Sequence, residues 1–247
     1  MDAASRVRGR IETVIDYAKA RKWFVGENPA RWKGHLDQLL PRPSRIKPVQ
    51  HQPAMPWRDV PAFYARLARD SDTSALALRY AILTALRTGA VRVATADEIN
   101  QAERLHVIPA GRTGAKNRGQ PLRVPLSDEV RAILAECEAR RTSHYLFGGA
   151  RAGKPISEMA LTVKLHALVP KVTVHGFRSS FRDWAADNAV PREVAEACLG
   201  HAVANRVETA YARSDLLARR REVMRSWATF VAGEVPVKSE EVARRAG

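Results

Sequence analysis

The sequence predicts a mainly α-helical protein with one small antiparallel β-sheet. Over most of the chain, apolar residues recur at the three-to-four-residue spacing of amphipathic helices. Two short segments, 104–109 and 121–126, instead alternate and contain β-branched residues, which is typical of strands. Apolar residues make up 45% of the 247-residue chain, enough to bury a core in one large domain or in a moderate domain with a smaller neighbour.

The first part of the chain, residues 5–40, is predicted to be helical. Ile11, Val14 and Ala18 lie at helical spacing, and the Gly-Glu-Asn-Pro sequence at 26–29 ends this first helix. Pro29 suits the first turn of a following helix, because that position needs no N–H donor. So short a segment cannot bury a core alone, and we interpret residues 1–40 as part of a larger helical domain.

Residues 41–56 are predicted to form an extended, basic linker between domains. Proline fixes φ and removes a hydrogen-bond donor, so a proline-rich segment favours extended chain. Five prolines are interspersed here with three basic residues: Pro41, Pro43, Pro48, Pro53 and Pro56 with Arg42, Arg45 and Lys47.

Residues 57–232 are predicted to form a second, larger domain. Its first helices cover 59–69 and 73–88, and Gly89 is expected to close the second of them. The two strands flank a glycine-rich basic loop at 111–119 and so form a hairpin. Further helices are predicted at 127–141, 157–169, 175–188, 191–199, 203–213 and 214–232, followed by a flexible tail at 233–247.

The charge of the chain points to a polyanionic partner. Forty-one Lys and Arg against 26 Asp and Glu give a net charge of +15, with a pI of about 10.6. The excess is spread over both predicted domains, with +6 in residues 1–52 and +9 in residues 53–232. Two separately basic domains favour a protein that wraps nucleic acid over one with a merely basic tail.

Several other classes of protein are disfavoured. No run of eighteen apolar residues is present, and the N-terminus lacks the apolar core of a signal peptide, so we expect a cytoplasmic protein without membrane spans. Cys137 and Cys198 lie far apart without His or Cys at ligand spacing, which argues against a disulfide scaffold and a zinc site. We expect no metal and no cofactor.

The most informative segment is Thr173–Trp184. Read as a helix, it places Phe177, Phe181 and Trp184 on one face, which should be buried, while Thr173 caps the start. A second face carries an imidazole and two guanidinium groups that together suit a phosphate: His175, Arg178 and Arg182.

Further candidate residues surround this segment in a recognisable order. Arg87 follows a buried helix, Lys116 lies in the hairpin loop, His201 follows Gly200, and Tyr211 comes ten residues later. Together with the His175-x-x-Arg178 pattern, this order resembles the tyrosine recombinase (phage integrase) family over residues 5–232. The sequence around these residues, such as His-Gly-Phe-Arg-Ser-Ser-Phe-Arg-Asp-Trp-Ala, is most similar to that of prophage and genomic-island integrases.

The resemblance implies a tyrosine-recombinase catalytic domain preceded by a partial helical core-binding domain, without the N-terminal arm-binding region of related integrases. It implies site-specific DNA recombination (integration) through a 3′-phosphotyrosine intermediate, with Tyr211 as nucleophile. Arg87 and Arg178 would hold the non-bridging phosphate oxygens, assisted by His201. Lys116 would protonate the leaving oxygen, and His175 would assist proton transfer from the tyrosine.

The resemblance also implies partners. Double-stranded DNA attachment sites would be bound by a homotetramer that is monomeric when free, with accessory DNA-bending or excisionase proteins, on the nucleoid in the cytoplasm. Most contacts should go to phosphates. The residues expected to bind DNA are Arg42, Arg45, Lys47, Arg112, Arg118 and Arg182.

Two departures from the family pattern keep alternatives open. The acidic residue expected three positions after Arg87 is Ala90, and a tryptophan often found downstream is Ala96. An acid at position 90 would support the cations of the site. The alternatives are a catalytically impaired DNA-binding integrase remnant, and an enzyme of related chemistry such as a type IB topoisomerase or telomere resolvase.

The last predicted helix has an apolar stripe that includes Leu217, Met224, Trp227 and Val231 and excludes residues 220 and 221. Such a stripe has to be buried. Two options remain: the helix completes the core of its own domain, or, as the resemblance implies, it docks on a neighbouring protomer.

Overall fold

The computed structural model describes residues 3–41, 52–112, 120–201 and 216–233. The chain divides into two compact units, Met1–His51 and Gln52–Gly247, called here the N-terminal and C-terminal units. Six of the predicted site residues lie outside the described residues: Arg42, Arg45, Lys47, Lys116, Arg118 and Tyr211.

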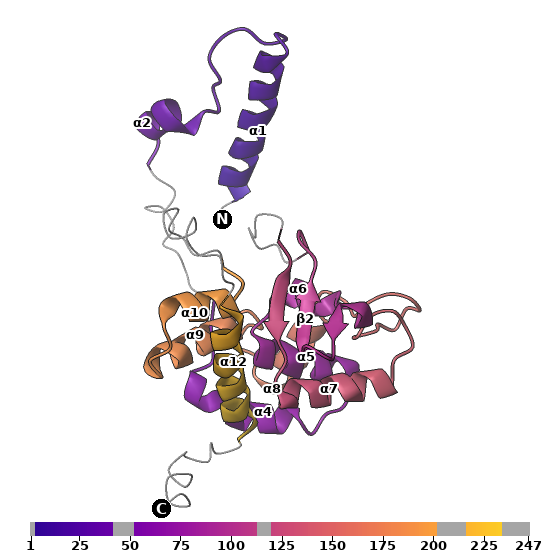
Figure 1. Ribbon diagram of the computed structural model, residues 1–247. Helices are drawn as coiled ribbons and strands as arrows, with labels where there is room; N and C mark the ends of the chain where they lie inside the picture. Colours follow the sequence, from indigo (N-terminus) through magenta and orange to yellow (C-terminus); the bar gives the residue numbers. More distant parts are fainter. Residues whose placement is uncertain (1–2, 42–51, 113–119, 202–215, 234–247) are drawn as a thin grey trace, which may run out of the picture. The chain divides into compact units, whose positions relative to one another are not determined.

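The N-terminal unit contains one long helix and a short helical segment (Figure 1). These are α1 (Ala3–Ala20), η1 (Trp32–Leu36) and α2 (Asp37–Leu39). The prediction that Pro29 begins a second helix is wrong, because Asn28 organises a turn there instead. Its Oδ1 accepts from the N–H of Ala30 at 2.9 Å, and its backbone carbonyl accepts from the N–H of Arg31 at 3.1 Å.

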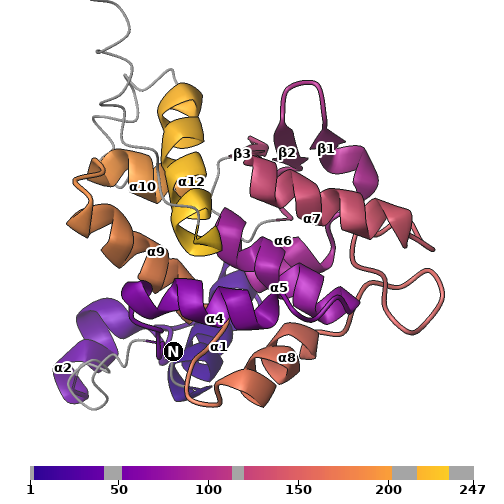
Figure 2. The ribbon, with the colours of Figure 1, turned by 90° about the horizontal axis from the view of Figure 1, so that it is seen from below.

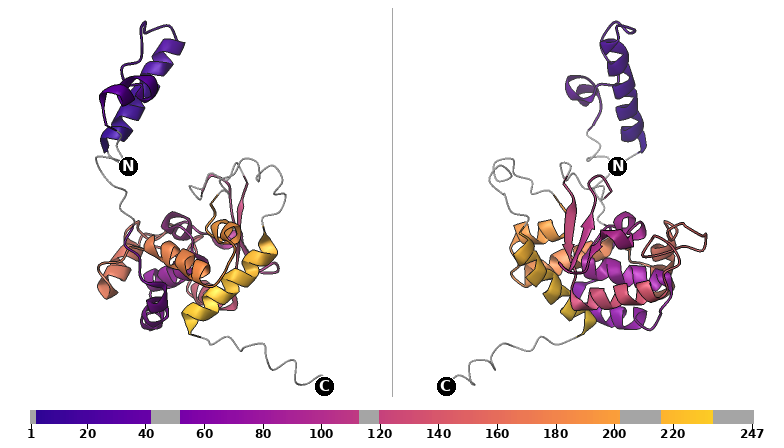
Figure 3. Two further views of the ribbon diagram at one scale, coloured as in Figure 1. Left: turned by 90° about the vertical axis from the view of Figure 1, so that its left-hand side faces the viewer. Right: turned by 45° about the vertical axis from the view of Figure 1, so that its right-hand side comes forward.

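The C-terminal unit is mainly helical, with a small sheet at one edge (Figure 3), as the sequence predicts. Its helical elements are η2 (Trp57–Asp59), α4 (Val60–Leu67), α5 (Thr73–Thr84), α6 (Thr88–Arg92), η3 (Ala96–Glu98), α7 (Asp128–Ala139), α8 (Ala160–Leu168), α9 (Gly176–Asp187), α10 (Arg192–Cys198) and α12 (Leu217–Ala232). No helix within the described ranges has the length and apolar character needed to cross a membrane.

The sheet has three antiparallel strands in the order β1-β2-β3. The predicted hairpin is present as β2 (Leu105–Ile108) and β3 (Leu122–Pro125), with Leu105 opposite Pro125 and Ile108 opposite Leu122. The additional strand β1 (Ile99–Asn100) pairs with β2. Two residues are too short for the alternation that reveals a strand in a sequence.

The helix predicted at 73–88 ends earlier, and Gly89 does not close it. Its last residue is Thr84, because Ala85 adopts a left-handed conformation with φ of 49°. A new short helix, α6, begins at Thr88 and contains Gly89. Arg87 occupies the N-cap of α6, so this break sets the position of the predicted catalytic arginine.

The core of the C-terminal unit includes the last described helix. α12 lies between α10 and β3 (Figure 2) and also packs on α4 and α5. Met224, Trp227 and Val231 are buried, and the indole Nε1 of Trp227 donates to the carbonyl of Ile82 at 2.9 Å. The stripe is therefore buried in its own unit, and the alternative that this helix docks on a neighbouring protomer is wrong.

One residue of α12 that was predicted to lie outside the apolar stripe is nevertheless buried. Arg220 is 2% exposed, and its guanidinium donates to the carbonyl of Arg123 on β3 at 2.5 Å. A buried arginine is stable only when its donors have partners. Arg220 thereby connects the last described helix to the hairpin.

Candidate active site

Helix α9 is fixed by its apolar face. Phe177, Phe181 and Trp184 are buried, as predicted, and Phe177 stacks on Phe63 with ring centroids 5.4 Å apart. Thr173 closes the first turn, because its Oγ1 accepts from the N–H of Gly176 at 3.0 Å. The polar residues of this helix therefore project from a rigid support.

The glycine after His175 is required by a close approach of the backbone. A Cβ at Gly176 would lie 2.3 Å from the carbonyl oxygen of Pro53. The same carbonyl accepts from the N–H of Thr173 at 3.0 Å, and Ser180 Oγ donates to the carbonyl of Met55 at 2.5 Å. Residues 53–55, which the sequence places in the linker, thus lie against α9 as part of the C-terminal unit.

Arg178 is the buried centre of the site, at 5% exposure. Its guanidinium donates to the carbonyl of Ala85, to the carbonyl of Leu199 at 2.7 Å and to Nε2 of His201 at 2.9 Å. Burial, together with the neighbouring charge of Arg87, lowers the pKa of Arg178 to about 10, so the group stays protonated at neutral pH. The left-handed residue that ends α5 therefore supplies one of the carbonyls that hold this cation.

His201 is directed at Arg178 by the glycine before it. Gly200 has φ of +62°, and a Cβ there would lie 2.9 Å from Leu122 Cδ2, so both the conformation and the space favour glycine. On the other side of the ring, Nδ1 of His201 lies 2.5 Å from Oε2 of Glu196. The imidazole is therefore held at both nitrogens.

Arg87 and His175 complete the cluster. Burial lowers the pKa of the half-buried Arg87. Burial also lowers the pKa of His175, and the charges of Arg178, Arg87 and His201 lower it further. Because these charges act on one ring, the structure brings four of the predicted site residues together: Arg87, His175, Arg178 and His201. His175 itself is exposed at the N-cap of α9.

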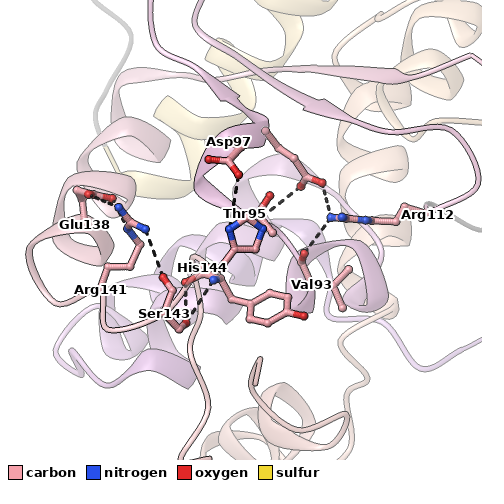
Figure 4. A network of polar contacts seen from close by, with 10 residues as sticks. Val93, Thr95, Asp97, Arg112, Glu138, Arg141, Ser143 and His144 are labelled. Atoms are coloured by element: carbon pink, nitrogen blue, oxygen red, sulfur yellow. Dashed lines mark hydrogen bonds and ion pairs between the residues drawn. The ribbon is translucent and has the colours of Figure 1, made fainter. Parts of the chain in front are cut away.

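Two of the residues expected to bind DNA make contacts within the protein. Arg182 is exposed, and its guanidinium lies 3.1 Å from Oε1 of Glu196. Arg112 forms an ion pair with Glu98 and donates to the carbonyl of Val93 at 3.1 Å; Figure 4 shows its guanidinium directed at that carbonyl. Arg112 stands where β2 leads into the segment that carries Lys116.

Behind Arg112 lies a buried polar chain that the sequence did not predict. His106 on β2 is fully buried, with Nε2 3.1 Å from Glu98 Oε2 and Nδ1 2.8 Å from the hydroxyl of Tyr80. Hydrogen bonds from His106 and from the N–H of Thr95, with the charge of Arg112, outweigh burial and lower the pKa of Glu98. This chain joins α5 to the sheet at the base of the hairpin.

Glu196 is the residue of the cluster that sequence reasoning missed. It lies on α10, five residues before His201, and the carboxylate contacts both His201 and Arg182. The sequence feature that could have indicated it is an acidic residue one helical turn before the Gly-His pair. Ala90, where the family pattern has an acid, is buried at 4% exposure.

The site so assembled suits an anion with several oxygen atoms. Two arginines and two histidines on rigid elements can donate to phosphate oxygens without reorganisation. In the described part of the chain, no group of three or more His, Cys, Asp or Glu could hold a metal ion. The structure thus combines a helical domain, a β-hairpin and a cluster of two arginines and two histidines whose chemistry suits an anion.

Comparison with known proteins gives the family of this domain. Residues 55–216 match the phage integrase family, and residues 1–35 match the phage integrase central domain. The chain therefore belongs to the phage integrase family. This agrees with the resemblance inferred from the order of its site residues.

Individual relatives and a solved structure agree with this assignment. The integrase of Enterobacteria phage P4 is 30% identical over 93% of this chain and 55% of its own length. Prophage integrase IntZ of Escherichia coli strain K12 is 28% identical over 93% of this chain and 56% of its own length. The chain thus spans about half the length of these relatives.

The fold resembles that of a lambda integrase fragment, residues 75–356, solved as a dimer bound to a COC′ core site. The TM-score is 0.57 with 16% sequence identity, covering 86% of this chain and 73% of that chain.

Proposed function

We propose that this chain carries the catalytic domain of a site-specific tyrosine recombinase, which cuts and rejoins DNA through a 3′-phosphotyrosine intermediate. The observation that supports it best is the cluster of Arg87, His175, Arg178 and His201 within a phage integrase domain. Tyr211 and Lys116 complete the proposed set of catalytic residues. The proposed substrates are double-stranded DNA attachment sites.

In the proposed cleavage step, the Tyr211 hydroxyl attacks the phosphorus of a phosphodiester. A bond forms between the tyrosine oxygen and phosphorus, and the bond from phosphorus to the 5′-oxygen breaks. The tyrosine proton passes to His175, and the departing 5′-oxygen takes a proton from Lys116. In rejoining, a 5′-hydroxyl attacks the phosphotyrosine, and the same groups act in reverse. Because the ester conserves the bond energy, rejoining needs no ATP.

The electrostatics of the described residues fit these roles. Charge that develops on the non-bridging oxygens would be stabilised by Arg87 and by Arg178, whose orientation is already fixed by two backbone carbonyls. Since its pKa lies below the usual 6.5, His175 is neutral at pH 7 and can accept a proton. The cations also favour the phenolate form of a nearby tyrosine.

The test is the capture of a covalent adduct. The protein would be incubated with a library of nicked duplexes of randomised sequence. A nick just downstream of the cleavage site lets the short fragment that carries the released 5′-hydroxyl diffuse away, which traps the intermediate. Denaturation-resistant adducts would then be recovered and sequenced. We expect adducts with the parent and with Tyr145→Phe as the control, and none with Tyr211→Phe, which keeps the ring and loses the nucleophilic oxygen.

Arg178→Ala should lower the rate of adduct formation by about 10²–10³-fold, the usual cost of removing one charge-stabilising donor. An adduct formed by Tyr211→Phe would contradict the assignment of the nucleophile. Normal cleavage by Arg178→Ala would contradict the role of the cluster.

Ala90 favours one alternative, a DNA-binding integrase remnant that no longer cleaves. In that case the parent would bind duplex DNA and form no adduct. A type IB topoisomerase or telomere resolvase would be indicated by relaxation of any supercoiled plasmid, or by sealing of ends without exchange between two duplexes.

We further propose that the segment of Arg42, Arg45 and Lys47, together with Arg112, Arg118 and Arg182, contacts DNA phosphates. The assembly on DNA would be a tetramer of a protein that is monomeric when free, helped by accessory DNA-bending or excisionase proteins. Its place of action would be the nucleoid.

Salt dependence tests the phosphate contacts. For duplex DNA, the slope of log K against log salt is about −0.9 per phosphate neutralised. Replacing Arg42, Arg45 and Lys47 together by Gln should make the slope shallower by about 2.7 if each residue meets one phosphate. Replacing Lys19, Arg21 and Lys22 by Gln gives a control with the same change in charge. Equal effects of the two triple variants would show that only net charge matters.

A further inference from the structure

We propose that Glu196 is a positioning residue for His201: its carboxylate accepts the Nδ1 proton and so directs Nε2 at Arg178 and at the substrate phosphate. The inference rests on the proposed function. Glu196 is not one of the six residues that carry the family pattern in this chain, which are Arg87, Lys116, His175, Arg178, His201 and Tyr211.

The geometry comes from the end of α10. Glu196 lies in the last turn of this helix, with its side chain 18% exposed. Oε2 lies 2.5 Å from Nδ1 of His201, and Oε1 lies 3.1 Å from the guanidinium of Arg182. Both carboxylate oxygens are engaged, so the carboxylate itself is held in one orientation.

The hydrogen-bond partners determine where the proton of the imidazole lies. A guanidinium has donors and no acceptor, so Nε2 must accept the hydrogen bond from Arg178 at 2.9 Å. A neutral imidazole then carries its proton on Nδ1, which donates to Glu196. An imidazole whose Nδ1 proton is held by a carboxylate in this way is also found in catalytic triads.

Glu196 can keep the same hydrogen bond when His201 contacts the substrate phosphate. When His201 donates to a phosphate oxygen, it does so from a protonated Nε2, and Nδ1 keeps its proton. Glu196 accepts from Nδ1 in both states, so the ring does not have to turn between them. Positioning of this kind avoids reorganisation during the reaction.

Charge supports the assignment as well. The cluster contains Arg87 and Arg178 close together, and Ala90 supplies no carboxylate near the first of them. Burial and Arg87 lower the pKa of Arg178, whereas the charge of Glu196 acts in the opposite direction. Glu196 therefore provides negative charge to a cluster of cations that lacks the acid expected at position 90.

The first test is spectroscopic and needs no DNA. In protein with 15N-labelled histidine, a proton bound to His201 Nδ1 and shared with a carboxylate should give a strongly downfield, slowly exchanging resonance. Its assignment comes from its loss in His201→Asn. We expect it in the parent, shifted in Glu196→Gln and lost in Glu196→Ala. Glu193→Gln, on the exposed surface of the same helix, is the control with the same change in charge and should leave it unchanged.

The second test separates catalysis from binding. With a cleavable duplex recovered by adduct capture, single-turnover cleavage is measured at saturating protein, and duplex affinity is measured separately. Glu196→Ala should cleave about 10–100-fold more slowly, the usual effect of losing such an orienting partner, with Kd changed less than about threefold. A thermal melt checks that the variant is folded.

Glu196→Gln distinguishes the two contacts of the carboxylate. Because Arg178 donates to Nε2, the Gln side chain would present its oxygen to Nδ1 and its amide NH2 to Arg182. This variant keeps the contact with His201 and loses the contact with Arg182. We expect it to recover most of the cleavage rate lost in Glu196→Ala.

Equally slow cleavage by the Gln and Ala variants would overturn the proposal, because the contact of Glu196 with Arg182, and not its contact with His201, would then be the one that matters. Persistence of the Nδ1 resonance in Glu196→Ala, or unchanged cleavage by that variant, would overturn it too. A parent that forms no adduct would instead contradict the proposed function, and the Nδ1 resonance would still decide whether Glu196 orients His201.

Discussion

The two units of this chain are both helical, yet they are held together in different ways. In the N-terminal unit, α1 buries none of its residues, and its apolar side chains Val7, Ile11 and Val14 are 53%, 47% and 68% exposed. The contacts of this helix with the following turn are polar. Arg8 donates to the carbonyl of Ala30 at 2.6 Å, and Asn28 donates to the carbonyl of Glu12 at 2.9 Å.

In the C-terminal unit, the same kind of apolar spacing leads to burial. Trp227 is fully buried against Phe181 and Trp184, with ring centroids 5.5 Å and 5.2 Å away. The difference shows that helical periodicity predicts a helix and a potential apolar face, whereas burial of that face depends on enough surrounding chain.

The polar contacts differ as well. In the N-terminal unit they join one helix to one turn through the buried amide of Asn28. In the C-terminal unit they satisfy larger buried side chains that can carry charge, such as Arg178, Arg220 and His106. Such groups are costly unless hydrogen-bonded, so they are stable only on a packed framework. The proposed catalytic cluster is built on the unit that has one.

The largest effect should come from a pair of tryptophan substitutions, one in each unit. Trp227→Ala removes a fully buried indole and its hydrogen bond to Ile82, and should lower the free energy of unfolding by about 3–5 kcal/mol. Trp23→Ala removes a side chain that is 72% exposed and should change it by less than about 0.5 kcal/mol. Chemical denaturation followed by circular dichroism measures both. Similar effects of the two substitutions would remove the contrast between the units.

A smaller effect is expected from the buried chain under the hairpin. Glu98→Gln keeps the shape and removes the charge that meets His106 and Arg112. At pH 7 we expect a loss of about 1–3 kcal/mol in the free energy of unfolding, as for other hydrogen bonds to charged groups.

The sign of the pH dependence follows from the lowered pKa of Glu98. The carboxylate is ionised more readily in the folded state, so its contribution is complete above the ordinary glutamate pKa of 4.5 and is lost as pH falls through the lower, folded value. The difference between parent and variant should therefore shrink below pH 4.5. A difference that is constant down to pH 3 would contradict a charged Glu98.

Much of the fold follows from local patterns. The helices α7, α9 and α10 and the β2–β3 hairpin lie within the predicted segments, because each has a clear period and turn residues at its ends. The early end of α5 could not be predicted, since Ala85 has no intrinsic preference for the left-handed conformation. That conformation is imposed by tertiary contacts, which include the buried guanidinium of Arg178.

The sequence pattern predicted which residues form the candidate cluster, but it gave no sign of which of them are buried. The spacing of His175 and Arg178 places them on one side of α9, but it gives no sign that Arg178 is buried while His175 is exposed. The two glycines before Phe177 and His201 could have indicated close backbone contacts. Glu196 gave only a weak signal, because an acid near a helix end is usually a solvated residue.

The smallest effect on global stability, and the most local, should come from the N-terminal unit. Asn28 is 2% exposed, and its amide donates to the carbonyl of Glu12 at 2.9 Å and to Asp16 Oδ1 at 2.7 Å. Asn28→Ala removes these bonds and the turn contact with Ala30. Because polar bonds rather than a core hold α1 to this turn, we expect the free energy of local opening to fall by about 1–2 kcal/mol.

Amide hydrogen exchange read separately for the two units measures this effect. Asn28→Ala should accelerate exchange about 5–30-fold in α1 and leave the protection of α5 and α12 unchanged, while Gln38→Ala, on the exposed surface of the same unit, should change neither. Equal acceleration in α5 would mean that the units unfold together. In that case the stability of α1 would derive from the core of the C-terminal unit, and the polar contacts of Asn28 would have no separate role.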